Sequence, residues 1–460
     1  MVLASISRAL ALALGAEGLL AGVVGFWAWI AGLPSAGGFL LLTTGALFVS
    51  GGTLLATRSR GRSLTRKTAL LSAAAIWGAL SIGGLVPFWV AGADPYAALF
   101  DSVSAVTTTG YWSIQVGGAD PALVLWRAVL QWTGGLTTLL LAAIVFLPAG
   151  LGGAAFSTPG LGSGISSLVP SVFRGVTVAY ASLTVICVFL LFASGTSAFD
   201  GVLYALSAIA TGGDPKGYPS SIPGAGTHLI LGIFMLIGAL WFPGTLNQPR
   251  VFLAAMARNR ETLLLAALVV GGISFAWLAV PNMGLVDGFF VTASMISTSG
   301  IVTEARDASI TPLLALAVIG GSVAGASGGL RLRRAWLLGA VIWNELNRGV
   351  QPHEVRTLRY GGQTAEPGLV SALFAFAVLW FSACAGLAVL LSVTGVTAED
   401  AILAAVAALT NTGPGMSTLV GAVTVPGGST GTTVLMAGML LGRLEVIALV
   451  AVLSPWFWTR

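Results

Sequence analysis

The feature that most constrains this chain is a succession of apolar segments, each as long as a bilayer-spanning helix. Such a helix needs about 20 predominantly apolar residues. Segments of this kind lie at about 9–31, 38–57, 68–92, 122–148, 173–194, 227–245, 262–281, 369–394 and 432–453, with an interrupted tenth at about 308–343. Because hydrocarbon offers no water to the backbone, each is predicted to be a helix. With 56% hydrophobic and 8% charged residues among 460, no soluble domain is expected. The sequence predicts an all-α integral membrane protein in a lipid bilayer.

Few residues point to a cleaved leader, a disulfide or a metal cluster. The first apolar segment is long, contains Glu17 and lacks an A-x-A cleavage site, so it is expected to be retained. Cys187 and Cys384 lie within apolar segments, where a cysteine behaves as a small hydrophobic residue. His228 and His353 are too few for a metal cluster. No nucleophile, base or metal set suggests an enzyme.

Basic residues predict the orientation, because loops rich in Lys and Arg stay in the cytoplasm. If the loop from Arg58 to Lys67 is cytoplasmic, both termini are cytoplasmic and 17 of the 21 basic residues lie on that side. The remaining four are Arg127, Lys216, Arg306 and Arg443. The basic balance is therefore a topology signal, and no nucleic-acid partner is needed to explain it.

Four outward-facing connections repeat one pattern, and they superpose without a gap. They read SAVTTTGYW (104–112), SAIATGGDP (207–215), SMISTSGIV (294–302) and AALTNTGPG (407–415). One column holds Gly110, Gly213, Gly300 and Gly413; the column before it holds Thr109, Gly212, Ser299 and Thr412; and the one before that holds Thr108, Thr211, Thr298 and Asn411. A single Thr-Thr-Gly is usually only a turn, whereas four copies in register indicate a shared site.

The apolar stretch before each motif is about half the length of a span, which predicts a re-entrant half-helix. Thirteen residues before the glycine, three copies carry Asp200, Asp287 and Asp400, which suit a helix N-terminus; the first copy has Ala97 there and Asp101 further in. The opposite, carbonyl-bearing end then lies inside the membrane and favours a cation. Rings of carbonyls replace the hydration shell of K⁺ in selectivity filters. The twelve residues of the three columns are therefore predicted to bind and select K⁺.

The four motifs, together with GGSVAGASGGLRLRRAWLL (320–338), QPHEVRTLR (351–359) and GRLEVIALVAVLSPWFW (442–458), resemble the Trk/Ktr/HKT superfamily of cation transporters, specifically its bacterial Trk-type branch. The resemblance implies four pseudo-symmetric repeats of helix, pore half-helix and helix around one central pore, preceded by two extra transmembrane helices. The corresponding ranges are 1–67 for the leading helices and 68–150, 151–261, 262–366 and 367–460 for the repeats. In plant relatives a serine in the first glycine column is associated with Na⁺, so four glycines favour K⁺.

A glycine-rich stretch interrupts the tenth apolar segment, and glycine weakens a helix by up to about 1 kcal/mol per residue. From the residues alone it could equally mark close helix packing. The resemblance instead implies an intramembrane loop that acts as a gate below the filter. The expected gate residues are Gly320, Gly321, Gly325, Ser327, Gly328, Gly329 and Arg443.

Arg443 is a strong base within an apolar segment, where a charge is costly and usually functional. Its expected partners are the carbonyls of the glycine-rich loop or the Glu445 carboxylate. The alternative is a charge near the inner end of its span that reaches the headgroups.

By resemblance, the chain is expected to take up K⁺ across the bacterial inner membrane, to hold K⁺ ions without a covalent cofactor, to form a homodimer and to bind a cytoplasmic nucleotide-binding regulatory subunit. A sodium- or proton-coupled symporter is the alternative. Two departures from the family pattern lie at the expected pore mouth. Asp214, Pro215 and Lys216 follow the glycine of the second motif. Tyr111 and Trp112 follow the glycine of the first, where they would narrow the entrance or anchor at the interface.

Overall fold

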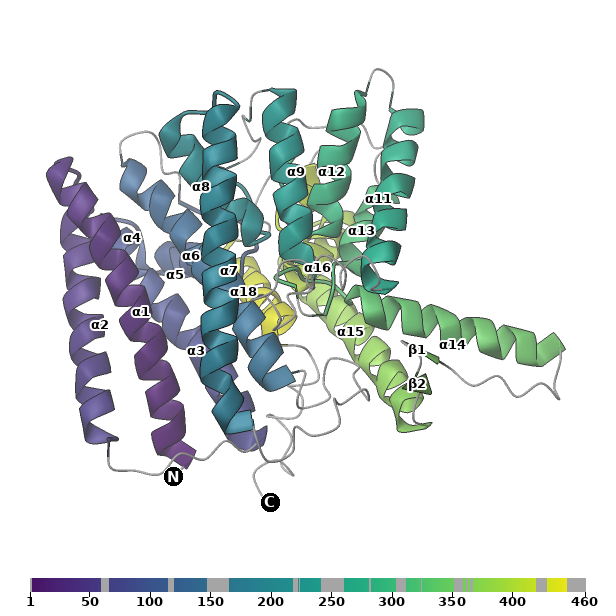
Figure 1. Cartoon of the computed structure of the whole chain (residues 1–460), viewed down its shortest axis with the longest axis horizontal. Helices are drawn as coiled ribbons and strands as arrows, with labels where there is room; N and C mark the ends of the chain where they lie inside the picture. The colour runs from purple at the N-terminus through teal and green to yellow at the C-terminus, as the bar shows by residue number, and fades with distance from the viewer. Residues whose placement is uncertain are drawn as a thin grey trace.

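The computed structural model describes residues 2–58, 66–114, 120–146, 165–217, 222, 224–240, 260–280, 283–302, 312–323, 325–350, 359–360, 363–364, 367–418 and 428–444. The helices stand side by side as one bundle, from which α14 projects (Figure 1). In chain order the elements are α1 (Val2–Ile30), α2 (Ala36–Ala56), α3 (Arg66–Gly84), α4 (Val86–Val90), α5 (Pro95–Val106), α6 (Pro121–Leu141), η1 (Ala142–Phe146), α7 (Ile165–Ala193), α8 (Ala198–Ile209), α9 (Ala225–Ala239), α11 (Arg260–Ala279), α12 (Leu285–Ile296), α13 (Leu314–Ile319), α14 (Leu332–Val350), β1 (Arg359–Tyr360), β2 (Gln363–Thr364), α15 (Pro367–Val393), α16 (Ala398–Thr410), α17 (Gly415–Thr418) and α18 (Gly428–Leu444).

The predicted all-α class is confirmed, apart from the two-residue strands β1 and β2, which pair antiparallel. Within the described residues, six helical stretches are long and apolar enough to cross a membrane, fewer than the ten predicted. They are 3–30, 36–56, 68–90, 171–193, 260–279 and 370–393. The difference has a physical reason for α6, whose 21 residues include the buried Arg127 and Gln131 and so form a less apolar helix. Helices α9 and α18 are described over 15 and 17 residues.

Large apolar side chains cover the outside of the bundle. Phe48 on α2, Phe189 on α7 and Val393 on α15 are 83%, 69% and 80% exposed. In water such a surface would be strongly unfavourable, whereas in a bilayer it meets acyl chains. The residues of the four repeated motifs are, by contrast, buried, except for the half-buried Trp112. The chain is therefore an integral membrane protein whose polar residues are gathered on the inside.

Each long helix that follows a motif packs against the short helix of the next repeat. The pairs are α6 with α8, α9 with α12, α13 with α16, and α18 with α5. The last pair joins the end of the chain to its first repeat: Tyr96 Oη on α5 donates to the Ser429 carbonyl on α18 at 2.5 Å. The four short helices therefore stand in a closed circle.

Glycines let three of these long helices approach the end of their own short helix. A Cβ at Gly134 on α6 would overlap the Val106 carbonyl oxygen, and one at Gly238 on α9 would overlap the Ile209 oxygen. At Gly442 on α18 the overlap would be with the Leu409 oxygen. Val106, Ile209 and Leu409 each lie four residues before the motif glycine, so the same backbone position is approached three times.

The leading helices α1 and α2 pack on each other and against the first repeat, where α1 contacts α3 and α6. Asp120, the N-cap of α6, accepts hydrogen bonds from the Ser35 backbone N–H and hydroxyl, both at 3.1 Å. These helices thus cover the first repeat on one side.

In the third repeat the long helix is broken, as the glycine-rich stretch predicted. Helix α13 ends at Ile319, residues 320–331 are not helical as far as they are described, and α14 begins at Leu332. Leu330 N–H bonds the Val318 carbonyl at 2.9 Å, and Leu332 N–H bonds the Gly321 carbonyl at 2.8 Å. The stretch is therefore a compact loop folded back on the end of α13.

Candidate cation pathway

Four short helices, α5, α8, α12 and α16, of 12, 12, 12 and 13 residues, lead into the four motifs. Ser197 caps α8 and Thr397 caps α16, each accepting from the N–H of the aspartate three residues on, Asp200 or Asp400. These aspartates, and Asp287 in α12, therefore lie in the first helical turn, where their charge offsets the helix dipole. The expectation that they are the caps themselves was wrong.

In the first copy the cap is Asp94, whose carboxylate accepts from the Tyr96 and Ala97 N–H groups at 3.0 Å. Asp94 lies three residues before Ala97, at the position that Ser197 and Thr397 hold in the second and fourth copies, so the acid of the first copy is the N-cap itself. Asp101, noted as lying further in, has no capping role. It pairs with Arg127.

Each short helix ends in the same turn. In the first copy, Thr109 N–H bonds the Ser104 carbonyl and Thr108 N–H bonds the Ala105 carbonyl, both at 2.8 Å. The corresponding bonds recur in the other three copies, with lengths of 2.9 to 3.2 Å. This is the Schellman arrangement, which normally places glycine in the left-handed conformation at the turn.

The left-handed residue of this turn is a threonine in three copies and an asparagine in the fourth. The φ angles are 55° at Thr108, 52° at Thr211, 60° at Thr298 and 56° at Asn411. A β-branched residue is a true outlier there, while asparagine is tolerated. Of the four motif glycines, Gly110, Gly300 and Gly413 have positive φ and the fully described Gly213 does not. Positive φ angles therefore occur both in the glycine column and in the column two residues before it.

The four motifs contact one another in a closed ring. A Cβ at Gly110 would lie 2.7 Å from the Gly213 Cα, which joins the first copy to the second. Ser299 Oγ donates to the Gly212 carbonyl at 2.6 Å, joining the third to the second. Cβ atoms at Gly300 and Gly413 would overlap the carbonyl oxygens of Thr412 and Thr109, which join the third copy to the fourth and the fourth to the first. The structure thus brings all twelve predicted filter residues together.

The carbonyls of the two columns before the glycine are largely free of protein donors. Gly212 O accepts from Ser207 Oγ at 3.0 Å and from Ser299 Oγ at 2.6 Å. The other seven of the eight carbonyl oxygens accept no hydrogen bond from the part of the chain that the structure describes; they belong to Thr108, Thr109, Thr211, Thr298, Ser299, Asn411 and Thr412. Buried carbonyls nearly always have a partner, so this cluster is suited to a cation.

The glycine-rich loop lies against the ring. Gly328 N–H donates to Thr298 Oγ1 at 2.7 Å, and a Cβ at Gly328 would overlap the Thr410 carbonyl oxygen. On its other side, the N–H groups of Ser322 and Ala326 bond the Ala239 and Gly238 carbonyls of α9 at 2.8 and 2.9 Å. The loop therefore touches α9 of the second repeat and the motifs of the third and fourth repeats.

Arg443 joins this loop to the first copy of the motif. Its Nε donates to the Thr107 carbonyl at 2.7 Å, its Nη2 donates to Thr108 Oγ1, and its Nη1 donates to the Ala326 carbonyl at 2.5 Å. The side chain is 3% exposed, so it does not extend to the headgroups. Of its two expected partners, the loop carbonyl is present, and Glu445 lies outside the described residues.

Two further side chains hold the loop in a way that sequence reasoning missed. Glu261 at the start of α11 accepts from Ser322 Oγ in the loop and from Arg333 Nε of α14 at 2.6 Å. Arg331 donates through Nη1 to the carbonyls of Ser322 and Gly325 at 3.1 and 2.9 Å. The sequence analysis counted Arg331 as a cytoplasmic charge, but it is buried within the loop it follows. The Glu261 contacts join residues that are 61 and 72 positions apart in the chain, so no local pattern signals them.

Comparison with known proteins relates the whole chain to one family. A family model described as "TrkH: Cation transport protein" matches residues 41–455. The chain is 28% identical over 455 residues to "Trk system potassium uptake protein TrkH" of Halomonas elongata, covering 91% of this chain and 90% of that one. It is 29% identical over 435 residues to the protein of the same name from Escherichia coli strain K12, covering 87% and 88%.

A solved structure is similar over its full length. It is described as the crystal structure of the potassium transporter TrkH from Vibrio parahaemolyticus, and it covers 100% of both chains with a TM-score of 0.84 and 26% sequence identity. The relatives are named as potassium uptake proteins or transporters, and none of these names describes an enzyme.

Proposed function

The chain belongs to the TrkH family of cation transport proteins, and on this premise we propose that it conducts K⁺ through the ring formed by its four motifs. The observation that carries the proposal is the set of seven buried carbonyl oxygens without a described donor, contributed by all four motifs in contact with one another. A dehydrated cation needs several such oxygens at once, and successive carbonyls of an irregular backbone supply them.

K⁺ is the proposed ion for two reasons. The relatives are named as potassium uptake proteins. In addition, each short helix directs its carbonyl end at the ring, and the partial negative charge of that end stabilises a monovalent cation without a formal anionic ligand. Within the described residues, no carboxylate belongs to the twelve-residue ring. A divalent ion would be served less well by a neutral site.

We further propose that the glycine-rich loop and Arg443 form the gate. The loop contacts the third and fourth motifs and α9 of the second repeat, and Arg443 extends this cover to the first motif. Opening then requires the loop to leave the ring and Arg443 to release Thr107, Thr108 and Ala326. Both changes break specific hydrogen bonds, so the closed arrangement is a defined state that a regulator can bias.

The remaining proposals concern the cellular setting. The protein lies in the bacterial inner membrane with both termini in the cytoplasm, as the basic loops suggest. It assembles as a homodimer and binds a cytoplasmic nucleotide-binding regulatory subunit. Helix α14 projects from the bundle and follows the gate loop directly, which makes it a suitable element to transmit such binding (Figure 1).

Growth of a K⁺-uptake-deficient bacterial host on low K⁺ tests the proposed function. The wild-type chain should restore growth, and the Gly213→Ala and Gly300→Ala variants, made at equal membrane level, should not. Restored growth must persist when the Na⁺ gradient is collapsed and the membrane potential is kept. A dependence on that gradient would favour the coupled symporter. No rescue by the wild-type chain, with its regulatory subunit co-expressed, would contradict the proposal.

A further inference from the structure

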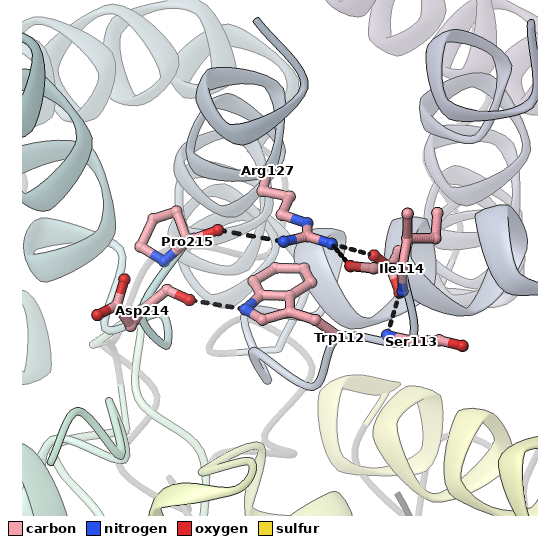
Figure 2. Close-up of polar contacts among 7 residues, drawn as sticks. Trp112, Ser113, Ile114, Arg127, Asp214 and Pro215 are labelled. Carbon is pink, nitrogen blue, oxygen red and sulfur yellow. Dashed lines mark hydrogen bonds and ion pairs between the residues drawn. The ribbon is translucent and has the colours of Figure 1, made fainter. Parts of the chain in front are cut away.

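A buried arginine joins the outer ends of the first and second motifs. Arg127 on α6 donates through Nη2 to Asp101 Oδ2 and to the Ile114 carbonyl, both at 2.6 Å. Its Nη1 donates to the Pro215 carbonyl at 3.4 Å. Figure 2 shows the guanidinium between Pro215, the last residue of the second motif, and Ile114, two residues after the end of the first. One side chain thus bonds the backbone of two neighbouring copies.

The partners of Arg127 are themselves fixed. Asp101 Oδ1 accepts from the Ser113 N–H at 2.6 Å and from the Ile114 N–H at 3.3 Å. The carboxylate on α5 therefore holds the outgoing segment of the first copy while it pairs with Arg127. Both side chains are buried, at 0% and 2% exposure, so solvent does not screen the pair.

Trp112 adds a second bond between the same two copies. The Arg127 guanidinium carbon lies 4.4 Å from the centre of the Trp112 ring, and Trp112 Nε1 donates to the Asp214 carbonyl at 2.6 Å. In Figure 2 the indole lies directly beside the guanidinium, with its nitrogen directed at Asp214. The sequence analysis expected Trp112 to narrow the entrance or anchor at the interface. In the structure it packs beside Arg127 and ties the first copy to the second.

The same face of α6 also holds the ring itself. Gln131, four residues after Arg127, donates to the Gly213 carbonyl at 3.0 Å, and Ser207 Oγ donates to the same oxygen at 2.7 Å. Gly213 is the one motif glycine without a positive φ. Its carbonyl is thus held from two sides, by Gln131 on α6 and by Ser207 on the second repeat's own α8.

The Arg127–Asp101 pair lies at the junction of the first and second copies. Nine residues before their glycines, the other three copies carry Tyr204, Val291 and Ala404 where the first carries Asp101. The second and third repeats are joined by a different pair, His228 Nδ1 and Asp287 Oδ1, 3.0 Å apart, which lies about one helical turn nearer the N-termini of its two helices. The ring is therefore symmetric in its backbone turns and asymmetric in what supports it from outside.

We propose that Arg127, together with Asp101, is a positioning residue that sets the preference for K⁺ over Na⁺ by fixing the spacing of the first and second motifs. The inference rests on the proposed function of the ring. Na⁺ is smaller than K⁺, so carbonyls coordinate it well only if the segments that bear them move inward. A guanidinium fork that bonds both outgoing segments and a buried carboxylate opposes that movement. Arg127 touches no ion; it acts through Ile114 and Pro215.

Two variants test the role without leaving an unpaired buried charge. Arg127→Lys keeps the charge but replaces the planar fork with a point charge that cannot bond three oxygens in one fixed geometry. The double variant Asp101→Leu/Arg127→Met removes both charges together, which buried ion pairs often tolerate. The matched control is Asp200→Asn, which breaks the half-exposed Lys216–Asp200 pair at the mouth of the second repeat.

The first readout is the K⁺-to-Na⁺ permeability ratio from reversal potentials of liposomes that contain the full-length protein. The ratio should fall about tenfold in both variants, the scale of one lost buried coupling, and stay at the wild-type value in Asp200→Asn. The second readout is the melting temperature in detergent with K⁺ minus that with Na⁺. This difference should shrink in both variants, because ion binding stabilises the folded state in proportion to affinity.

A purely structural role predicts otherwise: both variants would melt lower in either salt, with the K⁺-minus-Na⁺ difference and the permeability ratio unchanged. That result overturns the inference. A variant that no longer conducts is judged by its melting difference alone. If the wild-type protein itself shows no K⁺ permeability, the proposed function fails. If the wild type is selective and both variants are equally selective, only the inference about Arg127 fails.

Discussion

The ring of motifs and the layer below it are built in opposite ways. The ring repeats one turn four times, with the same backbone bonds at Thr108, Thr211, Thr298 and Asn411. The layer below is made once, from the loop of the third repeat and from Arg443 of the fourth. A site that surrounds an ion needs equivalent contributions from all sides, whereas a barrier needs only one element that can move. Ion selection is therefore expected to be shared among the four repeats, whereas gating is expected to depend on the third-repeat loop and Arg443.

The largest effect is expected from breaking the ring at a close contact. Gly300→Ala and Gly413→Ala each place a methyl group against a carbonyl oxygen of the adjacent copy and demand a positive φ from alanine. Overpacking of this kind costs about 1–3 kcal/mol, so K⁺ flux into liposomes should fall about 10- to 100-fold.

Gly395→Ala is the matched control for these two variants, because Gly395 has a φ of 90° and no atom near its added Cβ. The Gly395→Ala variant has the strain of an alanine at positive φ, but its added methyl group overlaps no neighbouring atom. Flux in Gly395→Ala close to the wild-type value would assign the loss to the ring contact. Equal losses in all three variants would show that strain alone, anywhere in the chain, explains the result.

The next effect, opposite in sign, is expected from Arg443→Gln. The substitution removes the charged bonds to Thr107, Thr108 and Ala326, each worth about 1.5–3 kcal/mol for a charged group. If the closed loop loses about 1.4 kcal/mol relative to the open one, basal K⁺ flux without a regulatory subunit should rise about tenfold.

Arg334→Gln provides the comparison for Arg443→Gln. Arg334 is also buried, and its guanidinium carbon lies 4.2 Å from the centre of the Phe376 ring on α15. This variant should lose stability without gaining basal flux. A rise in both variants would mean that general loosening, and not release of the loop, opens the pathway.

A smaller increase is expected from Ser322→Ala, which removes the bond from the loop to Glu261 and leaves the Glu261–Arg333 pair in place. One such bond is worth about 1 kcal/mol, which corresponds to a rise in basal flux of about fivefold. The control Ser274→Ala removes an exposed hydroxyl of α11 that bonds its own helix, and its flux should match the wild type. Unchanged flux in Ser322→Ala would show that the bond between Ser322 and Glu261 does not help to hold the gate closed.

The smallest effect is expected from Asn411→Thr, which makes the fourth copy match the other three. Asn411 Nδ2 donates to Thr109 Oγ1 at 3.0 Å and to the Met439 carbonyl at 2.9 Å. Threonine loses both bonds and is less favourable by roughly 1 kcal/mol or more in the left-handed conformation. The melting temperature should drop by a few degrees while the K⁺-to-Na⁺ ratio changes little. A large change in that ratio would show that the copies do not share selection equally.

The repeated parts of this molecule were predictable from the sequence, and the single contacts were not. The glycine column and the half-length apolar stretches recur four times, so local composition and spacing indicate the short helices and the ring. The run from Gly320 to Gly329 likewise indicates a broken helix, because so many glycines cannot sustain one. Arg443 was found because a charge within an apolar segment is conspicuous.

What the sequence missed depends on tertiary proximity. Asp101 meets Arg127 across the first repeat, and Glu261 meets Ser322 over 61 residues. Neither pair has a local spacing that signals it. The left-handed threonines were missed for a different reason, since β-branched residues are rare in that conformation and only the close packing of the ring imposes it.

The most direct test of the central claim is the reversal potential of liposomes that contain the purified wild-type protein, measured under opposed K⁺ and Na⁺ gradients. If the buried carbonyls of the four motifs select K⁺, the reversal potential should lie close to the K⁺ equilibrium potential. It should shift toward the Na⁺ equilibrium potential when Gly300 is replaced by alanine. A wild-type potential midway between the two ions, unchanged in Gly300→Ala, would contradict the account.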